Sequence, residues 1–403
     1  KFRRMSMPNG MRSTLSLEGL LAEALRPHAN LALGKQGYWR QSNHMKTKAV
    51  SLLRELTEAH SVPGHEDEVR AIFVDELGDS GDLYTDRMGS VFCDLAGEGP
   101  RVLIAGHMDE VGFLVQNITH EGFIQFVALG GWWEHNLLGQ RVEILTRTGE
   151  KILGVVASRP PHFLPEAQRR QVQTIEQLYI DVGAESRLQA IDEFGISLGD
   201  PIAPCSLFTA LSREDHFMAK AFDNRVGMAA VIQAGQILAA TDHPNHLVLC
   251  GTVQEEVGLR GAKAAAVFAK PDVAIILEGP PADDGPGFNR ADCQGRLGGG
   301  VQIRLYDPTA ITNPRLARLA IDTARAEGIP HQVTVRRSGG TDAGSFHQAN
   351  SGIPSIVLGV PARYIHSHNA IIDINDHLHL IALVTALVGK LDTHTVDSLT
   401  TYL

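Results

Sequence analysis

The residues with the clearest chemical potential are histidines and carboxylates that directly follow short apolar runs. His107 and Asp109 come after the apolar run at residues 101–105, within Gly106-His-Met-Asp-Glu. In extended chain these two side chains lie on the same side, so one can bind a metal while the other orients it. Taken alone, the pair is better explained as a polar loop after a strand.

Three carboxylates follow the same placement. Asp223 opens a predicted helix, where a capping role is the simpler explanation if it is taken alone. Glu255 and Glu256 end an apolar run at residues 246–253, and neighbouring side chains on a strand point to opposite sides. One of them can therefore ligate a metal while the other acts as a base. Two acids at the end of a buried strand are costly unless they are paired or bound to cations.

Two further residues complete the set. Glu278 ends the apolar run at residues 272–277, and His366 lies just past the run at residues 354–359. The five clusters together offer histidine and carboxylate ligands without a thiolate, a donor set that suits Zn, Co or Mn. One cluster would be weak evidence, but five at successive strand ends predict a metal site.

The elements that must position these residues alternate between strand and helix. The four apolar runs are continuous, which is typical of strands buried on both faces of a mostly parallel sheet. Helical patterns fall between them, at residues 224–240, 261–269, 313–327 and 375–392. Strands that alternate with helices predict an α/β fold, a three-layer α/β/α sandwich, whose sites lie at the carboxyl ends of the strands.

The rhythm changes between residues 113 and 207, where short alternating segments are separated by Gly-rich turns. We interpret residues 113–207 as a small β-rich domain, inserted into a catalytic domain formed by residues 45–112 and 208–403. Residues 1–44 are basic, and Met45 opens an amphipathic helical pattern. We expect residues 1–44 to be a poorly ordered, non-catalytic extension, either a transit peptide or sequence upstream of the true start.

Composition narrows the classes of partner. The net charge of -10 argues against nucleic acid and anionic membrane surfaces, and no run of about 18 apolar residues predicts a membrane span. The four cysteines form no CxxC pair, which fits free thiols in a reducing compartment. We therefore expect a cytoplasmic protein.

Five segments carry a family resemblance, which runs from about Met45 to near the C-terminus. They are Ala105-Gly-His-Met-Asp-Glu-Val-Gly-Phe, Ala221-Phe-Asp-Asn-Arg-Val-Gly, Gln254-Glu-Glu-Val-Gly-Leu-Arg-Gly-Ala, Gly339-Gly-Thr-Asp-Ala-Gly and Arg363-Tyr-Ile-His-Ser. In order and spacing, the sequence resembles the dinuclear metallo-aminopeptidases that include the tetrahedral (TET), glutamyl and deblocking aminopeptidases.

The resemblance implies a role for each candidate residue. It implies two divalent metal ions per subunit, with Asp223 bridging both and joined to Asn224 by a cis peptide. The ligands implied beside Asp223 are His107, Glu256, Glu278 and His366. Asp109 would orient His107, and Glu255 would be the general acid/base.

Two positions depart from the family pattern. The family more often has aspartate where Glu278 stands, so Asp283, Asp284 and Asp292 are competing ligands. His368 stands where proline is commoner, and we interpret it as a neighbour of the site, not a ligand. The Gly339–Gly344 loop, with Asp342, is expected to be structural.

Kinship also implies peptide substrates, a dimerisation role for the inserted domain and a homo-oligomer, a hollow tetrahedral dodecamer. An amidase or deacylase on the same metal scaffold is the nearest alternative, and a non-enzymatic scaffold is another. A glycoside hydrolase such as an endoglucanase fits less well. It needs two carboxyls about 5–9 Å apart but no histidine ligands, and three Trp and six Tyr provide few sugar-stacking rings.

Overall fold

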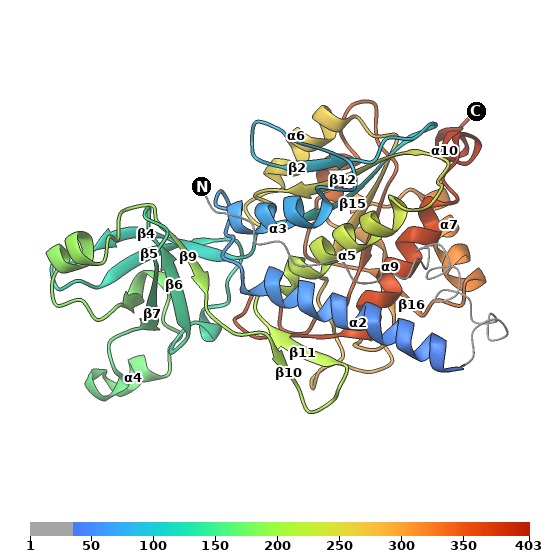
Figure 1. Cartoon of the computed structure of the whole chain (residues 1–403). Coiled ribbons are helices and arrows are strands. Elements are labelled where there is room, and N and C mark those ends of the chain that lie inside the picture. The colour runs from blue at the N-terminus through green and yellow to red at the C-terminus, as the bar shows by residue number, and fades with distance from the viewer. Residues whose placement is uncertain (1–34) are drawn as a thin grey trace.

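The computed structural model describes residues 35–403, and their side chains from His44 onward. A nine-stranded mixed sheet forms the centre of the larger part of the molecule (Figure 1). Its strands, in spatial order, are β1 (Asp82–Thr85), β2 (Val91–Asp94), β12 (His246–Thr252), β3 (Arg101–His107), β13 (Val273–Glu278), β17 (Ser355–Gly359), β14 (Val301–Asp307) and β15 (Ala310–Ile311), with β16 (His331–Val335) also paired to β14.

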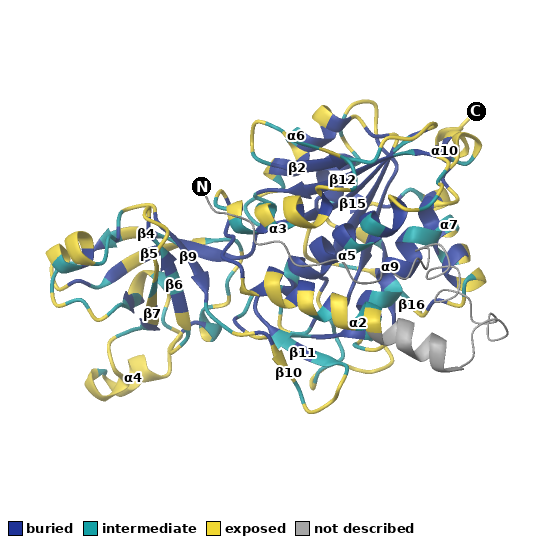
Figure 2. Cartoon of the chain, viewed as in Figure 1, coloured by how far each residue is buried: buried dark blue, intermediate teal, exposed yellow. Residues whose placement is uncertain are grey.

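The central strands are apolar throughout because both of their faces are covered. In β3, Val102 and Ile104 pack into one hydrophobic cluster, whereas Leu103 and Ala105 pack into a second cluster on the other face. The strands β12, β3, β13 and β17 run parallel to one another. Figure 2 shows the resulting buried layer, and the carboxyl ends of these strands therefore meet at one edge.

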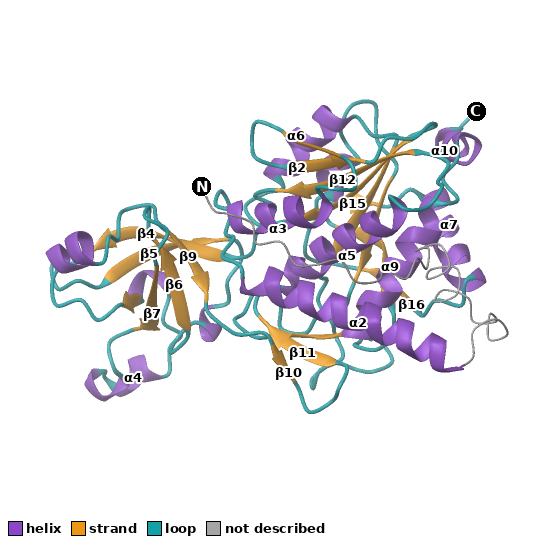
Figure 3. Ribbon diagram, viewed as in Figure 1, coloured by secondary structure: helices purple, strands orange, loops and turns teal. Residues whose placement is uncertain are grey.

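Helices cover both faces of the sheet (Figure 3). Apolar residues of several helices join the first cluster, among them α2 (Lys35–Glu58), α3 (Asp67–Leu77), α5 (Phe222–Leu238), α7 (Pro314–Ala326) and α9 (Ile374–Val388). Residues of α6 (Arg260–Ala269) and α8 (Ala343–Phe346) join the second. The helix α10 (Thr393–Thr400) ends the chain, and β10 (Thr209–Ala210), β11 (His216–Ala219) and β18 (Ala370–Asp373) form a small separate sheet. The predicted α/β layers are confirmed.

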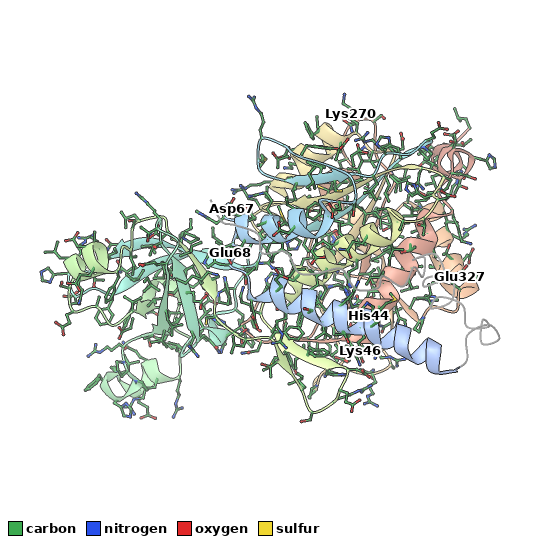
Figure 4. The ribbon with its side chains drawn as sticks, viewed as in Figure 1. His44, Lys46, Asp67, Glu68, Lys270 and Glu327 are labelled. Atoms are coloured by element: carbon green, nitrogen blue, oxygen red, sulfur yellow. The ribbon has the colours of Figure 1, made fainter. Side chains whose placement is uncertain are left out.

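A small closed barrel projects from the α/β domain, drawn in green in Figure 1. Its strands are β4 (Gly112–Ile118), β5 (Ile124–Leu129), β8 (Tyr179–Asp181), β7 (Lys151–Ala157), β6 (Arg141–Leu145) and β9 (Pro201–Pro204), and a short helix, α4 (Glu166–Arg169), lies in one connection. It has a hydrophobic core of its own. Lys151 of β7 donates a 2.9 Å hydrogen bond to Glu68 of α3, whose position is labelled in Figure 4.

Two helices differ from the prediction at their ends. The helix expected to open at Met45 begins ten residues earlier, at Lys35, so residues 35–44 are helical in the structure, where we expected poor order. Residues 1–34 of the expected extension lie outside the described residues. The predicted helix at 375–392 ends at Val388, and α10 follows after a bend.

Among residues 35–403, no single helix is long and apolar enough to cross a membrane. The pair α9 and α10 reaches that length and composition only across a 94° bend. Many residues of α9 are buried in the core of the α/β domain.

Candidate metal centre

The ends of parallel strands and the loops after them bring five of the predicted residues to one edge of the sheet. His107 is the last residue of β3, and Glu278 is the last residue of the neighbouring strand β13. Glu255 and Glu256 follow β12, which flanks β3 on its other side. His366 lies in the loop after β17.

Asp223 reaches the same edge from the start of α5. The peptide bond between Asp223 and Asn224 is cis, as the resemblance implied. The Asn224 side chain donates to the Leu277 carbonyl at 2.8 Å and accepts from the Gly227 amide at 3.0 Å, which ties α5 to the end of β13. A Cβ on Gly227 would meet Asn224 Oδ1 at 2.2 Å, so glycine is required for this close approach.

The donor atoms form two groups that share Asp223. In the first, which we call the core half, His107 Nε2 lies 3.3 Å from Asp223 Oδ1 and 3.6 Å from Glu278 Oε2. In the second, the boundary half, His366 Nε2 lies 3.5 Å from Asp223 Oδ2 and 3.3 Å from Glu256 Oε1. The two oxygens of one carboxylate thus face two different histidines.

These distances fit a pair of divalent cations. With bonds of about 2.0–2.2 Å, two ligands on one tetrahedral ion lie about 3.3–3.6 Å apart. Glu278 Oε1 is buried without a hydrogen-bond partner, and Glu256 Oε1 is buried with the His366 ring 3.3 Å away. Burial of such oxygens is expensive unless something else binds them. The donors are imidazole and carboxylate groups, the types that Zn, Co and Mn accept.

The electrostatics of the cluster also favour the binding of positive charge. Burial raises the pKa of Glu278 and that of Glu255 well above their ordinary range. Repulsion from the neighbouring carboxylates raises both values further. Burial lowers the pKa of His366, but hydrogen bonds to Asp223 and Glu256 outweigh it and raise the value to about 11. Glu255 and Glu278 favour neutral forms and His366 favours a cation, so positive charge is stabilised among these buried carboxylates.

Asp109 contacts both the side chain of His107 and the segment that carries Glu255 and Glu256. Its backbone carbonyl lies 3.0 Å from His107 Nδ1, and its carboxylate Oδ1 lies 3.5 Å from the same nitrogen. The two carboxylate oxygens also accept the backbone N–H groups of Glu255 and Glu256, each at 3.0 Å. The predicted partner of His107 therefore also fixes the turn that carries both glutamates.

Glu255 faces the cavity beside this cluster. The cavity has a volume of about 380 Å³ and is lined by His107, Asp223, Glu255, Glu256 and Glu278, among others. Its far wall holds Arg304, which pairs with Asp307 at 3.3 Å. Glu255 also offers an oxygen within 4.8 Å of donor atoms of His107 and Glu278, so it borders the core half.

The barrel supplies a contact that the sequence did not predict. His366 Nδ1 lies 2.7 Å from the backbone carbonyl of Gly131, in the loop after β5. A hydrogen bond from Nδ1–H to a carbonyl fixes the tautomer and leaves Nε2 free as a ligand. His366 itself has a left-handed backbone, with φ at 54°. A carbonyl contact has no side-chain signature, and only the Gly130-Gly131 pair marked the loop as one of close approach.

A buried ionic network holds the chain behind the site. Glu110 pairs with Lys220 at 2.5 Å and with Arg225 at 3.1 Å. Arg225 also donates to the carbonyls of Leu56 and Met108. All three charged groups are buried, so removal of one partner leaves an uncompensated charge, typically at a cost of about 3–5 kcal/mol. The network ties the loop after His107 to α5, the helix that carries Asp223 near its start.

The competing ligands lie elsewhere. Asp283 and Asp284 pair with Arg336 and Arg363 at 2.8 and 2.6 Å, and Asp292 accepts a hydrogen bond from Asn289. His368 is buried beside Trp132, with ring centroids 5.8 Å apart, and is absent from both donor groups. Asp342 is buried beneath the site and accepts a hydrogen bond from Thr252.

Known proteins share this arrangement of sequence and fold. Residues 89–383 match the family described as M42 glutamyl aminopeptidase. The glutamyl aminopeptidase of Lactococcus lactis subsp. cremoris is 37% identical over 357 residues, which covers 87% of this chain and 98% of the relative.

Solved structures agree. A TET aminopeptidase from a marine sediment Thaumarchaeota archaeon is 39% identical with a TM-score of 0.85, and the match covers 88% of this chain and 99% of that one. The TET1 peptidase of Pyrococcus horikoshii is 31% identical with a TM-score of 0.76, over 85% and 100% of the two chains. The chain therefore belongs to the M42 glutamyl aminopeptidase family and is a metal-dependent aminopeptidase.

Proposed function

We propose that the enzyme removes N-terminal residues from peptides with two divalent cations held around Asp223. His107 and Glu278 would hold one ion, His366 and Glu256 the other, and Asp223 would contact both. The observation that carries this proposal is the facing of His107 Nε2 and His366 Nε2 toward the two separate oxygens of Asp223, at 3.3 and 3.5 Å. When bound, two such ions polarise a carbonyl and lower the pKa of a water molecule toward neutrality. Zinc, cobalt and manganese all suit these ligands.

Glu255 is the group that would move protons. It lines the pocket beside both histidines, with an oxygen within 4.8 Å of donor atoms of His107 and Glu278. Its carboxylate accepts the proton of the attacking water and returns it to the departing amine, a role that requires only reach and a suitable pKa. Asp109 holds the Glu255 amide at 3.0 Å, so the carboxylate that orients His107 also positions the base.

The test separates the base from the ligands. Unmodified enzyme should hydrolyse aminoacyl p-nitroanilides, lose activity on chelation, and regain it with Co or Zn. Glu255→Gln should lower kcat by about 10²–10⁴-fold, since general-base catalysis contributes that much, with metal content unchanged by elemental analysis. Full activity of Glu255→Gln, or activity confined to N-acylated amino acids, would contradict the proposal.

The oligomer belongs to the same proposal. The P. horikoshii relative is reported to assemble into a tetrahedron or a large octahedral shell. Several barrel side chains expose apolar surface, including Leu153 and Val155 of β7, which supports the barrel of residues 113–207 as a dimerisation domain within a dodecamer. Native mass spectrometry should find twelve subunits, and Val155→Glu should shift the population toward smaller species.

The free thiols of all four cysteines, each within the described residues, support a cytoplasmic location.

A further inference from the structure

A second cavity opens beside the catalytic pocket. It has a volume of about 670 Å³ and lies between the barrel loop that includes Trp133 and Gln140 and the loop of residues 364–369. The two cavities share Gly131, Ile365 and His366 in their linings. They therefore adjoin at His366, where a chain bound at the metal centre would pass from one toward the other.

The two cavities differ in charge. The catalytic pocket is lined by Asp223, Glu255, Glu256 and Glu278, whereas none of the described residues that line the side cavity is Asp, Glu, Lys or Arg. Carboxylates stabilise a cation such as a free α-ammonium group. A cavity without carboxylates offers no anion to that group, but its amide side chains can bond the backbone of a peptide without regard to sequence.

The side cavity carries the groups that peptide binding requires. Asn136, Gln140 and Asn369 present amide side chains. Trp133 and Tyr364 are 62% and 58% exposed, which leaves their rings available to a ligand. Trp132 is committed to the fold instead, since it stacks on Phe113 at 4.7 Å and donates to the Gly112 carbonyl at 3.1 Å.

We propose that the side cavity binds the part of the peptide that follows the scissile bond, with apolar or aromatic side chains preferred there over charged ones. This inference rests on the proposed aminopeptidase function. The N-terminal residue then lies in the carboxylate-lined pocket, and the departing chain leaves between the barrel and residues 364–369. The barrel would thus contribute directly to substrate binding.

The first test removes an aromatic ring. A preferred N-terminal residue, Xaa, is first chosen from a panel of aminoacyl amides. Trp133→Ala is then assayed with two substrates that begin with this residue, Xaa-amide and Xaa-Phe-Ala-Ala-amide. The ratio of kcat/KM for the tetrapeptide to that for Xaa-amide should fall by about 3- to 10-fold, the size expected for loss of one aromatic contact. Phe163→Ala, an equally exposed aromatic residue of the barrel that lies outside the cavity, should leave the ratio unchanged. An unchanged ratio in Trp133→Ala would overturn the inference.

The second test gives the cavity a charge and reads out direction. Gln140→Lys should favour Glu over Lys at the second and third peptide positions by about 3- to 10-fold, and Gln140→Glu should do the reverse, with weaker effects at high salt. The preference at the first position should stay as in the unmodified enzyme. A shift at the first position instead would place the N-terminal residue in this cavity and refute the proposal.

Two readouts keep this inference separate from the proposed function. If the unmodified enzyme fails to hydrolyse Xaa-amide, the aminopeptidase proposal itself fails. If Xaa-amide is hydrolysed but Gln140→Lys changes only the oligomeric mass in native mass spectrometry, without changing downstream preference, the cavity is a contact between subunits and the inference alone fails.

Discussion

The two halves of the proposed metal centre draw their residues and contacts from different parts of the fold. The core half is made by strand ends within the α/β domain, and the His107 side chain is only 2% exposed. The boundary half depends on a loop histidine that is 32% exposed and whose Nδ1 is held by a carbonyl of the barrel. The core half is therefore complete once α5 has packed on the sheet. The boundary half needs the barrel loop in place as well.

The two histidine rings therefore differ in how firmly the protein holds them. His107 is enclosed by Asp109, Asp223 and Glu278, so its ring has no room to move. His366 is held by Gly131 from one side and by carboxylates from the other. We expect the ion of the boundary half to bind more weakly and to depend on the state of the barrel.

The largest effect should come from the residue that both halves share. Asp223→Ala removes one oxygen ligand from each half, so we expect loss of both ions and a fall in kcat/KM of at least about 10³-fold, because stabilisation of developing charge at the metal centre is lost. Elemental analysis of the purified variant measures the ions, and hydrolysis of an aminoacyl amide measures activity. Two ions per subunit retained in this variant would show that Asp223 does not bridge them.

Removal of each histidine should separate the halves. His107→Ala should lose the core ion and lower the melting temperature, because it leaves Glu278 and Asp109 buried near an empty space, at a cost of about 1–3 kcal/mol. His366→Ala should retain about one ion per subunit and melt close to the unmodified enzyme. Elemental analysis and calorimetry in metal-free and metal-loaded samples provide the measurement. Equal metal loss and equal destabilisation in the two variants would contradict the distinction between a core and a boundary half.

The same contrast explains how far sequence could lead. The core half was predictable because continuous apolar runs require parallel strands buried on both faces, and their carboxyl ends must meet at one edge. His107, Glu256 and Glu278 therefore converge for reasons visible in the pattern. The close packing of α5 on β13 is also visible in the sequence, since Gly227 leaves the space that the Asn224 side chain occupies.

The rest depended on contacts that carry no sequence signal. Gly131 and His366 are separated by 235 positions, and the contact uses a backbone carbonyl, which every residue possesses. The left-handed backbone of Ala221, Gln254 and His366 was equally hidden, since none of them is glycine. Such conformations cost about 1–3 kcal/mol each and persist only where the surrounding structure enforces them. Local patterns cannot report a strain that tertiary packing imposes.

The smallest expected effect tests the link between the barrel and the boundary half. Gly130 has φ at 83°, and a Cβ there would lie 2.7 Å from Val111 Cγ1 and 3.3 Å from Glu256 Cβ. Gly130→Ala should therefore displace the loop that holds His366 and weaken binding of the second ion by about 10-fold, at the lower end of losses from disturbed outer contacts.

The neighbouring glycine provides the matched control. A Cβ on Gly131 would meet His366 Nδ1 at 3.5 Å, an ordinary contact, and its φ is not among the positive values. Gly131→Ala should therefore bind both ions as the unmodified enzyme does in a chelator titration followed by elemental analysis. If Gly130→Ala released both ions together, the halves would not be separable. If it released only the ion of the boundary half, the barrel would be shown to govern one ion while the α/β domain holds the other.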